Sequence, residues 1–169
     1  PPALRQSSFY RLLKNIREYN EVYKKSGAVH GCALCIDENI EKFIEDVGRH
    51  NATDAIAGYM LLEEIDGSDK LFYTTGRLTS EMIIKVAIMG IPILFSRAGI
   101  TKMGLELSQK LGVTTISRAA GKHFLVYNGA DTVIYDAKPK EKTGSRFNTS
   151  ENSEESTDDD RRRGAELSR

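Results

Sequence analysis

The sequence predicts an α/β protein built as a three-layer α/β/α sandwich around a mixed sheet, and two observations predict it. Apolar stretches of strand length alternate with stretches of helical periodicity through the middle of the chain, which is typical of parallel strands joined by helices. Before them, strand-like residues 26–36 and 40–46 are separated only by the turn-like residues 37–39. This spacing is typical of an antiparallel hairpin, so we expect the hairpin to open the sheet.

Local patterns then place each element. Residues 9–23 carry large apolar side chains at helical spacing, with Ser7 or Ser8 as the expected N-cap. Gly112 is suited to end a helix in the left-handed conformation. Helices are expected at 9–23, about 51–64, 79–89 and from a Thr101 cap to Leu111; strands are expected at 26–36, 40–46, 70–75, 93–96, 113–117, 123–128 and 132–136.

Composition divides the chain into two parts. Of the 169 residues, 40% are hydrophobic, which is enough for one domain with a core, expected at 1–137. Residues 138–169 have almost no large apolar side chains and many charges, so we expect a disordered charged tail there.

Charge and targeting signals narrow the class of protein. The formal net charge is zero, so no overall field attracts nucleic acid or a membrane surface. No apolar run approaches the roughly 20 residues that span a bilayer. Two cysteines do not make a secreted disulfide framework, and the start has no signal-peptide pattern, so we expect a cytoplasmic protein. A start at Pro1-Pro2 without methionine indicates a piece of a longer protein.

Three arginines stand where a predicted strand ends and a helix begins: Arg49, Arg77 and Arg97. The start of a helix has unpaired backbone N–H groups and a partial positive charge, so it attracts anions. If the strands are parallel, the three junctions open on one edge of the sheet. Three guanidinium groups with free amides predict a site for a polyphosphate or a nucleotide.

A local alternative exists for each of these residues. His50 and Asn51 could contact a base or a phosphate, but His50 could equally cap its helix. Each arginine could also serve only a local ion pair: Arg49 with Asp46 or Asp54, Arg77 with Glu81, and Arg97 with Glu106.

Cys32 and Cys35 form a C-x-x-C pair near His30, which suggests zinc or redox chemistry. Side chains alternate along a strand, so His30 and Cys32 share one face while Cys35 points to the other. A structural role for both thiols therefore stands beside the metal and thiol hypotheses.

Four segments carry a resemblance to a known family. GAVHGCAL (27–34), EDVGRHNATDAIAG (45–58), TTGRLTSEMIIKVAIMGIPILFSRAGIT (74–101) and FLVY (124–127) resemble, in this order, the FdhD family of formate dehydrogenase accessory sulfurtransferases. The resemblance implies a cytidine-deaminase-like fold without the deaminase zinc.

The same resemblance implies a function. The protein would take sulfur from a cysteine desulfurase and pass it to the molybdenum bis(molybdopterin guanine dinucleotide) cofactor before that cofactor enters the catalytic subunit of formate dehydrogenase. GDP would be a mimic of this cargo, and a homodimer is left open. The resemblance places cofactor contacts at Gly48, Arg49, His50, Asn51, Arg77, Ser96 and Arg97, and at Phe124, Leu125, Val126, Tyr127, Asn128 and Gly129.

One part of the family pattern is missing from the sequence. The family carries its persulfide cysteine in a C-x-x-C loop upstream of the segment that matches GAVH, so no catalytic residue is assigned here. A non-catalytic nucleotide-binding or docking module, or a nucleotide-modifying enzyme on a deaminase-like scaffold, remain alternatives.

Overall fold

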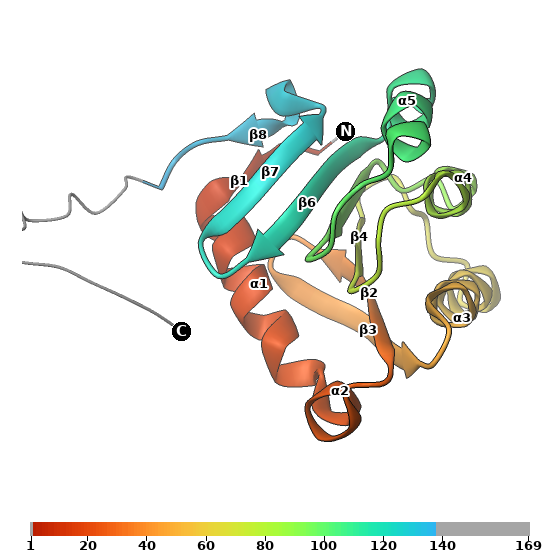
Figure 1. Cartoon of the computed structure of the whole chain (residues 1–169). Helices are drawn as coiled ribbons and strands as arrows, with labels where there is room; N and C mark the ends of the chain where they lie inside the picture. Colours follow the sequence, from red (N-terminus) through yellow and green to blue (C-terminus); the bar gives the residue numbers. More distant parts are fainter. Residues whose placement is uncertain (1, 138–169) are drawn as a thin grey trace, which may run out of the picture. The chain divides into compact units, whose positions relative to one another are not determined.

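The structure is a computed structural model that describes residues 2–137. Figure 1 labels most of its helices and strands. The predicted tail at 138–169 lies outside the described residues.

A six-stranded mixed sheet forms the middle of the domain (Figure 1). Its spatial order is β3-β2-β4-β5-β6-β7, with β4, β5 and β6 parallel to one another and β2 and β7 antiparallel to their neighbours. The strands are β2 His30–Ile36, β3 Asn39–Asp46, β4 Leu71–Thr74, β5 Ile93–Ser96, β6 Thr114–Ala120 and β7 His123–Asn128. The mixed sheet and its opening hairpin, β2–β3, are confirmed.

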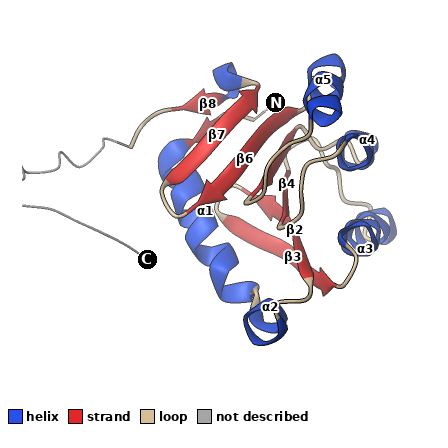
Figure 2. Ribbon diagram, in the orientation of Figure 1, coloured by secondary structure: helices blue, strands red, loops and turns tan. Residues whose placement is uncertain are grey.

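Helices cover both faces of this sheet, as Figure 2 shows. α1, Gln6–Tyr19, lies on one face and is followed by the short α2, Glu21–Ser26. The other face carries α3, α4 and α5, which are Arg49–Leu62, Ser80–Ile88 and Lys102–Leu111. The predicted three-layer arrangement is therefore confirmed.

Two hydrophobic clusters fill the spaces between the layers. Alternate residues of each strand point to opposite faces, so Tyr73 and Phe95 pack under α1 with Phe9, while Phe72 and Leu94 join the cluster under α3–α5. Phe9 and Phe95 meet edge to face, with ring centroids 5.1 Å apart. The two clusters therefore pack both faces of the sheet against helices, which fixes the positions of the strand ends and of the loops that follow them.

The two ends of the domain differ from the prediction. β8, Val133–Ile134, does not join the main sheet but pairs in parallel with β1, Leu4–Arg5. The expected serine cap of α1 is wrong, because the helix begins at Gln6 with Arg5 at the N-cap position. Ser7 instead donates from its amide and its hydroxyl to the carboxylate of Asp136, 2.8 Å away in each case. A contact distant in sequence therefore replaces the local cap.

The predicted ends of α5 are confirmed. Thr101 Oγ1 accepts a hydrogen bond from the amide of Gly104 at 3.1 Å, and Gly112 ends the helix at φ 68°. No helix among residues 2–137 is long and apolar enough to cross a membrane.

Candidate functional site

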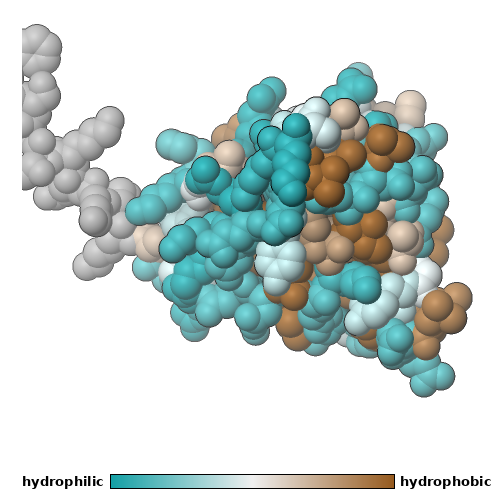
Figure 3. Space-filling view, turned by 90° about the horizontal axis from the view of Figure 1, so that it is seen from below, coloured by the Kyte–Doolittle hydropathy of each residue, from teal (hydrophilic) through white to brown (hydrophobic). Residues whose placement is uncertain are grey.

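The three arginine junctions lie at the same edge of the sheet. β3 and β4 both run antiparallel to β2, so they end at one edge, and β5 runs parallel to β4. We call this the arginine edge; it comprises the loops and helix starts at residues 46–51, 75–79 and 97–101. Figure 3 views the molecule from below Figure 1 and shows hydrophilic residues over much of this face, with hydrophobic residues gathered toward its right half.

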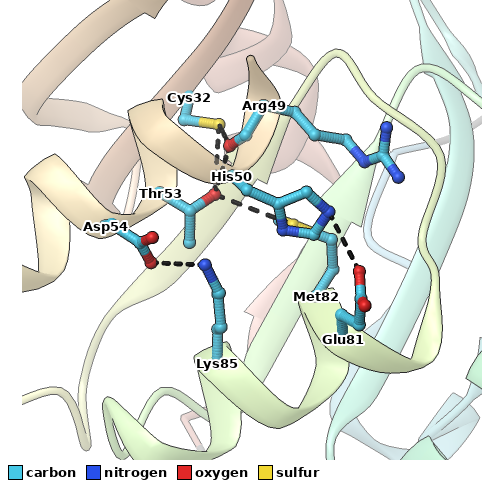
Figure 4. A network of polar contacts seen from close by, with 8 residues as sticks. All are labelled: Cys32, Arg49, His50, Thr53, Asp54, Glu81, Met82 and Lys85. Carbon is cyan, nitrogen blue, oxygen red and sulfur yellow. Dashed lines mark hydrogen bonds and ion pairs between the residues drawn. The ribbon is translucent and has the colours of Figure 1, made fainter.

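Arg49 is the first residue of α3, two residues earlier than the predicted helix start. Its stem packs on Gly76 in the β4–α4 loop: a Cβ atom at Gly76 would lie 2.5 Å from Arg49 Cδ. Its Nε is buried and has no hydrogen-bond partner among the described residues. In Figure 4 the Arg49 side chain extends away from Cys32 and Thr53. Packing thus holds the stem, while the charged group has no hydrogen-bond or ion-pair partner within residues 2–137.

The carboxylates that could have paired with the arginines bind other groups. Asp46 Oδ1 accepts from the amide of Gly48 at 2.7 Å and from the side-chain amide of Asn51 at 3.0 Å. The remaining three contact other side chains: Asp54 contacts Lys85 (2.5 Å), Glu81 contacts His50 (3.2 Å) and Glu106 contacts Lys102 (3.8 Å). Among residues 2–137, Arg49, Arg77 and Arg97 form no ion pair. The local ion-pair hypothesis is therefore wrong within the described chain.

The helix starts at this edge are not equivalent. The N-cap residues of α3 and α4, Gly48 and Thr79, make no side-chain capping bond, whereas Thr101 caps α5. Unsatisfied amides at the first turn of a helix favour anions. The α3 and α4 starts, beside Arg49 and Arg77, are therefore the better anion sites.

Ser96 organises this edge from inside. It is fully buried, and its hydroxyl donates to the carbonyl oxygen of Gly76 at 2.6 Å and accepts from the amide of Ala98 at 2.9 Å. Thr74 Oγ1 accepts from the amide of Gly76 at 3.1 Å. Ser96 thus ties the β4–α4 and β5–α5 loops together and does not itself face a ligand.

His50 and Asn51 stand at the start of α3 but are partly engaged. His50 Nε2 faces Glu81, and Asn51 donates to Asp46 (Figure 4 shows the His50–Glu81 pair). These contacts link α3 to α4 and to the end of β3, so both residues fix the geometry of the α3 start.

Arg97 lies against an aromatic ring of α2. Its guanidinium carbon lies 5.1 Å from the centroid of the Tyr23 ring in α2, on the α1 side of the sheet. Arg49 lies at the start of α3, in the layer on the opposite face. Arg97 and Arg49 therefore lie toward different faces of the sheet, and a site shared by all three arginines stays a prediction.

The first four residues of the predicted contact segment, 124–127, alternate between the core and the surface along β7. Phe124 and Val126 pack against the cluster under α1, and Phe124 meets Phe9 edge to face at 5.2 Å. Leu125 and Tyr127 point the other way and are 50% and 38% exposed. Of this segment, Leu125 and Tyr127 are the side chains that a ligand or partner can reach.

The last two residues of the segment, Asn128 and Gly129, lie away from the arginine edge. β7 runs antiparallel to β6, so Asn128 and Gly129 come at the opposite edge of the sheet. Asn128 Nδ2 donates to the carbonyl oxygens of Ser108 and Val113, at 3.2 and 2.8 Å. Gly129 takes φ 77° and packs on Thr114. The structure does not bring these two residues together with the arginines.

Arg118 joins the edge and was not predicted. It lies in a bulged part of β6 at φ 51°, a conformation that is costly for a residue with a side chain. Its amide donates to the carbonyl oxygen of Ala98 at 2.9 Å, and its Nη2 would lie 3.8 Å from a Cβ at Gly99. Nothing in the sequence signals a left-handed arginine, because the conformation depends on the β6–β7 pairing.

The two cysteines are buried on opposite faces of the sheet, as the alternation predicts. Cys32 belongs to the cluster under α3–α5 and Cys35 to the cluster under α1. The Cys32 thiol donates to Thr74 Oγ1 at 3.4 Å and lies 3.6 Å from Thr53 Oγ1. Burial raises the pKa of both thiols. Residues 2–137 contain no group of three His, Cys, Asp or Glu that could hold a metal ion.

Known proteins resemble this chain over most of the described residues. The sequence model of the FdhD/NarQ family matches residues 1–134. The sulfur carrier protein FdhD of Bacillus pumilus is 36% identical over 117 residues, which are 69% of this chain and 45% of that protein. The Wolinella succinogenes protein of the same name is 32% identical over 131 residues, 76% of this chain and 46% of that protein.

A solved structure agrees with these sequences. A crystal structure from Desulfotalea psychrophila, assigned as a formate dehydrogenase accessory protein, superposes with a TM-score of 0.74 and 32% identity, and the match covers 79% of this chain and 57% of that one. The chain spans about half the length of the curated relatives it matches. With a family match that extends from residue 1 to 134, the chain belongs to the FdhD/NarQ family.

Proposed function

We propose that this chain is the cofactor-binding part of a sulfur carrier that serves formate dehydrogenase. Its cargo would be the molybdenum bis(molybdopterin guanine dinucleotide) cofactor, its sulfur donor a cysteine desulfurase, and its recipient the catalytic subunit of formate dehydrogenase. The observation that supports this most is the arginine edge, where Arg49 and Arg77 have no carboxylate partner among residues 2–137.

The residues of this edge fit the phosphate groups of such a cargo. Arg49 and Arg77 would each donate to phosphate oxygens, and charge-assisted hydrogen bonds contribute about 1.5–3 kcal/mol. The uncapped starts of α3 and α4 would add backbone amides. The Ser96 hydrogen bond and the His50–Glu81 contact order the loops and helix starts of this edge before a ligand binds, which reduces the entropy lost on binding.

The cysteines of this chain do not fit the sulfur-carrying step. A carrier thiol must be accessible and ionised, whereas Cys32 and Cys35 are fully buried and burial raises their pKa. We therefore propose that the persulfide forms on a cysteine outside residues 2–137 and that this part holds the cargo.

Guanine and adenine nucleotides distinguish this function from a pure docking module. Isothermal titration of the chain with GDP and with ADP should show binding of both through phosphate, with GDP tighter. Binding of the formate dehydrogenase subunit without binding of either nucleotide would reject cofactor binding and favour the docking module. Hydrolysis or deamination of the nucleotide during the titration would favour the nucleotide-modifying enzyme.

A further inference from the structure

We infer that Thr74 is a positioning residue for the anion site of the arginine edge, and that it acts on Arg49 through Gly76. Thr74 is the last residue of β4 and is fully buried. Its hydroxyl lies between a buried thiol of β2 and the backbone of the β4–α4 loop. The inference rests on the proposed function for the ligand, and on hydrogen bonds and packing for the position of Arg49.

Thr74 belongs to a row of small polar side chains that crosses three adjacent strands. In the register of the sheet it lies opposite Cys32 of β2 on one side and opposite Ser96 of β5 on the other, and all three residues are fully buried. Phe72 and Leu94, two residues earlier in β4 and β5, belong to the cluster under α3–α5, so Thr74 and Ser96 point to that face. The apolar core on this face therefore ends in a polar row where the loops of the arginine edge begin.

Two hydroxyls of this row hold the backbone of Gly76. The amide of Gly76 donates to Thr74 Oγ1 at 3.1 Å, and the carbonyl oxygen of Gly76 accepts from the Ser96 hydroxyl at 2.6 Å. A threonine hydroxyl that accepts from the amide two residues later closes a local turn. Because a buried N–H group needs a partner, the loop leaves β4 in the conformation that the Thr74 hydroxyl allows.

Cys32 orients the hydroxyl that closes this turn. The Cys32 thiol donates to Thr74 Oγ1 at 3.4 Å and lies 3.6 Å from Thr53 Oγ1. Thr53 Oγ1 in turn donates to the carbonyl oxygen of Arg49 at 2.8 Å. Figure 4 shows the Cys32 sulfur beside this carbonyl oxygen and the Thr53 hydroxyl. The buried thiol, a weak donor, therefore links the end of β4 to the first turn of α3.

Gly76 transmits this geometry to the Arg49 side chain. A Cβ atom at Gly76 would lie 2.5 Å from Arg49 Cδ and 3.3 Å from Arg49 Cβ, so the stem of the arginine lies directly on the loop backbone. A shift of the Gly76 backbone would therefore displace the guanidinium group. Thr74 acts on this cation through the loop, and not by contact with the ligand.

Three threonine substitutions separate the hydroxyl of Thr74 from the shape of its side chain. Thr74→Val keeps the branched shape but leaves the Gly76 amide without its acceptor, whereas Thr74→Ser keeps the hydroxyl. Thr115→Val is the matched control. Thr115 is a fully buried threonine near the start of β6, at the opposite edge of the sheet, and its hydroxyl contacts Ser108 of α5 at 3.4 Å.

Calorimetric titration with GDP measures the anion site of these variants. We expect GDP to bind about tenfold more weakly to Thr74→Val, the effect of one displaced phosphate contact. Thr74→Ser and Thr115→Val should bind GDP as the unaltered chain does. In an Arg49→Ala background, Thr74→Val should cause no further loss, because a residue that acts through Arg49 has nothing left to position. A purely structural role would lower stability without this dependence on Arg49.

Hydrogen exchange of the Arg49 Nε–H group, followed by NMR, tests the position of the side chain without a ligand. Arg49 Nε is buried, so its exchange should be slow in the unaltered chain and in Thr74→Ser, and severalfold faster in Thr74→Val. Circular dichroism checks that each variant folds. Thr74→Ala, which removes the hydroxyl without adding an atom, replaces Thr74→Val if the valine variant does not fold.

The two measurements distinguish the inference from the proposed function. Exchange as slow in Thr74→Val as in the unaltered chain would overturn the inference, whether or not GDP binds. An equal loss of GDP affinity with and without Arg49 would overturn it as well. If the unaltered chain bound no GDP but exchange at Arg49 still depended on the Thr74 hydroxyl, the positioning role would stand and the proposed function would be rejected.

Discussion

Arg49 lies directly against Gly76, so closely that a single added carbon at Gly76 would come 2.5 Å from Arg49 Cδ. The β4–α4 loop thereby determines where the α3 arginine can extend. A residue with no side chain in one loop positions the charged group at the start of a helix from another part of the sequence.

Gly76→Ala should therefore weaken GDP binding without removing any arginine. The new methyl group displaces the Arg49 stem, and we expect affinity to fall about tenfold, the effect of one lost phosphate contact of about 1.4 kcal/mol. Titration calorimetry of the variant measures this.

Gly58→Ala is the matched control for that variant. Gly58 lies within α3 and a Cβ there meets nothing within 4 Å, so GDP affinity should not change. The free energy of unfolding should rise by about 0.5–1 kcal/mol, because alanine favours helix over glycine. If Gly76→Ala bound GDP as tightly as Gly58→Ala, GDP binding would not depend on the present position of the Arg49 side chain.

Two variants of Arg118 can distinguish a role of this residue in the backbone fold from a role in ligand binding. Its φ of 51° is strained for arginine but not for glycine. Arg118→Gly should therefore be more stable than Arg118→Ala by about 1 kcal/mol in chemical denaturation. Both variants should bind anions more weakly than the unaltered chain if the guanidinium group serves the edge.

Two results would contradict these predictions for Arg118. Equal stability of the glycine and alanine variants would show that the backbone is not strained there, and unchanged GDP affinity in both would exclude Arg118 from the anion site.

The two threonines that precede α4 and α5 should respond in opposite ways. Thr101→Ala removes the bond from the Gly104 amide and should cost about 1 kcal/mol of unfolding free energy. Thr79 makes no capping bond, and its Oγ1 is buried without a partner among residues 2–137. Thr79→Val should therefore leave stability equal or slightly higher, since it removes an unsatisfied polar atom. A loss as large as that of Thr101→Ala would show that Thr79 caps α4 in solution.

Because both thiols are buried, we predict that they react slowly with thiol reagents and that the free energy of unfolding depends on pH. Burial raises the pKa of Cys32 and Cys35, so a thiol reagent should modify the native chain slowly even at pH 9, while the unfolded chain should react at once. The folded form holds its protons above the unfolded thiol pKa of about 8.5, so stability is complete below that pH and decreases as pH rises above it.

Denaturation of the Cys32→Ala/Cys35→Ala variant between pH 8 and 10 checks this, because its decrease in stability should be smaller. Rapid labelling of either native cysteine, followed by persulfide formation with a cysteine desulfurase, would place the sulfur-carrying thiol in this part of the chain.

Much of the fold could be predicted because its signals are local. The alternation of strands and helices, the turn at residues 37–39 and the Thr101 cap all depend on neighbours in sequence. The position of Arg49, Arg77 and Arg97 at one edge followed from parallel strands alone. The opposite faces of Cys32 and Cys35 followed from the period of two in a strand.

The predictions that were wrong have a different cause, which is contact between residues that are distant in sequence. Ser7 does not cap α1 but donates to Asp136, which lies 129 residues away in sequence. Likewise, β8 pairs with β1, which comes from the N-terminal end of the described chain. The direction of Arg97 depends on the Tyr23 ring, which α2 places. Sequence shows which charges exist, but only the packing of distant elements decides which carboxylate each cation meets.

The central claim is that Arg49 holds a phosphate of the cargo. The most direct measurement is the dissociation constant of GDP for the unaltered chain and for Arg49→Ala, determined side by side by titration calorimetry. The loss of one charge-assisted contact of about 1.5–3 kcal/mol predicts that GDP binds about 10- to 150-fold more weakly to Arg49→Ala at the α3–α4 side of the edge. Equal dissociation constants for the two proteins would contradict the account.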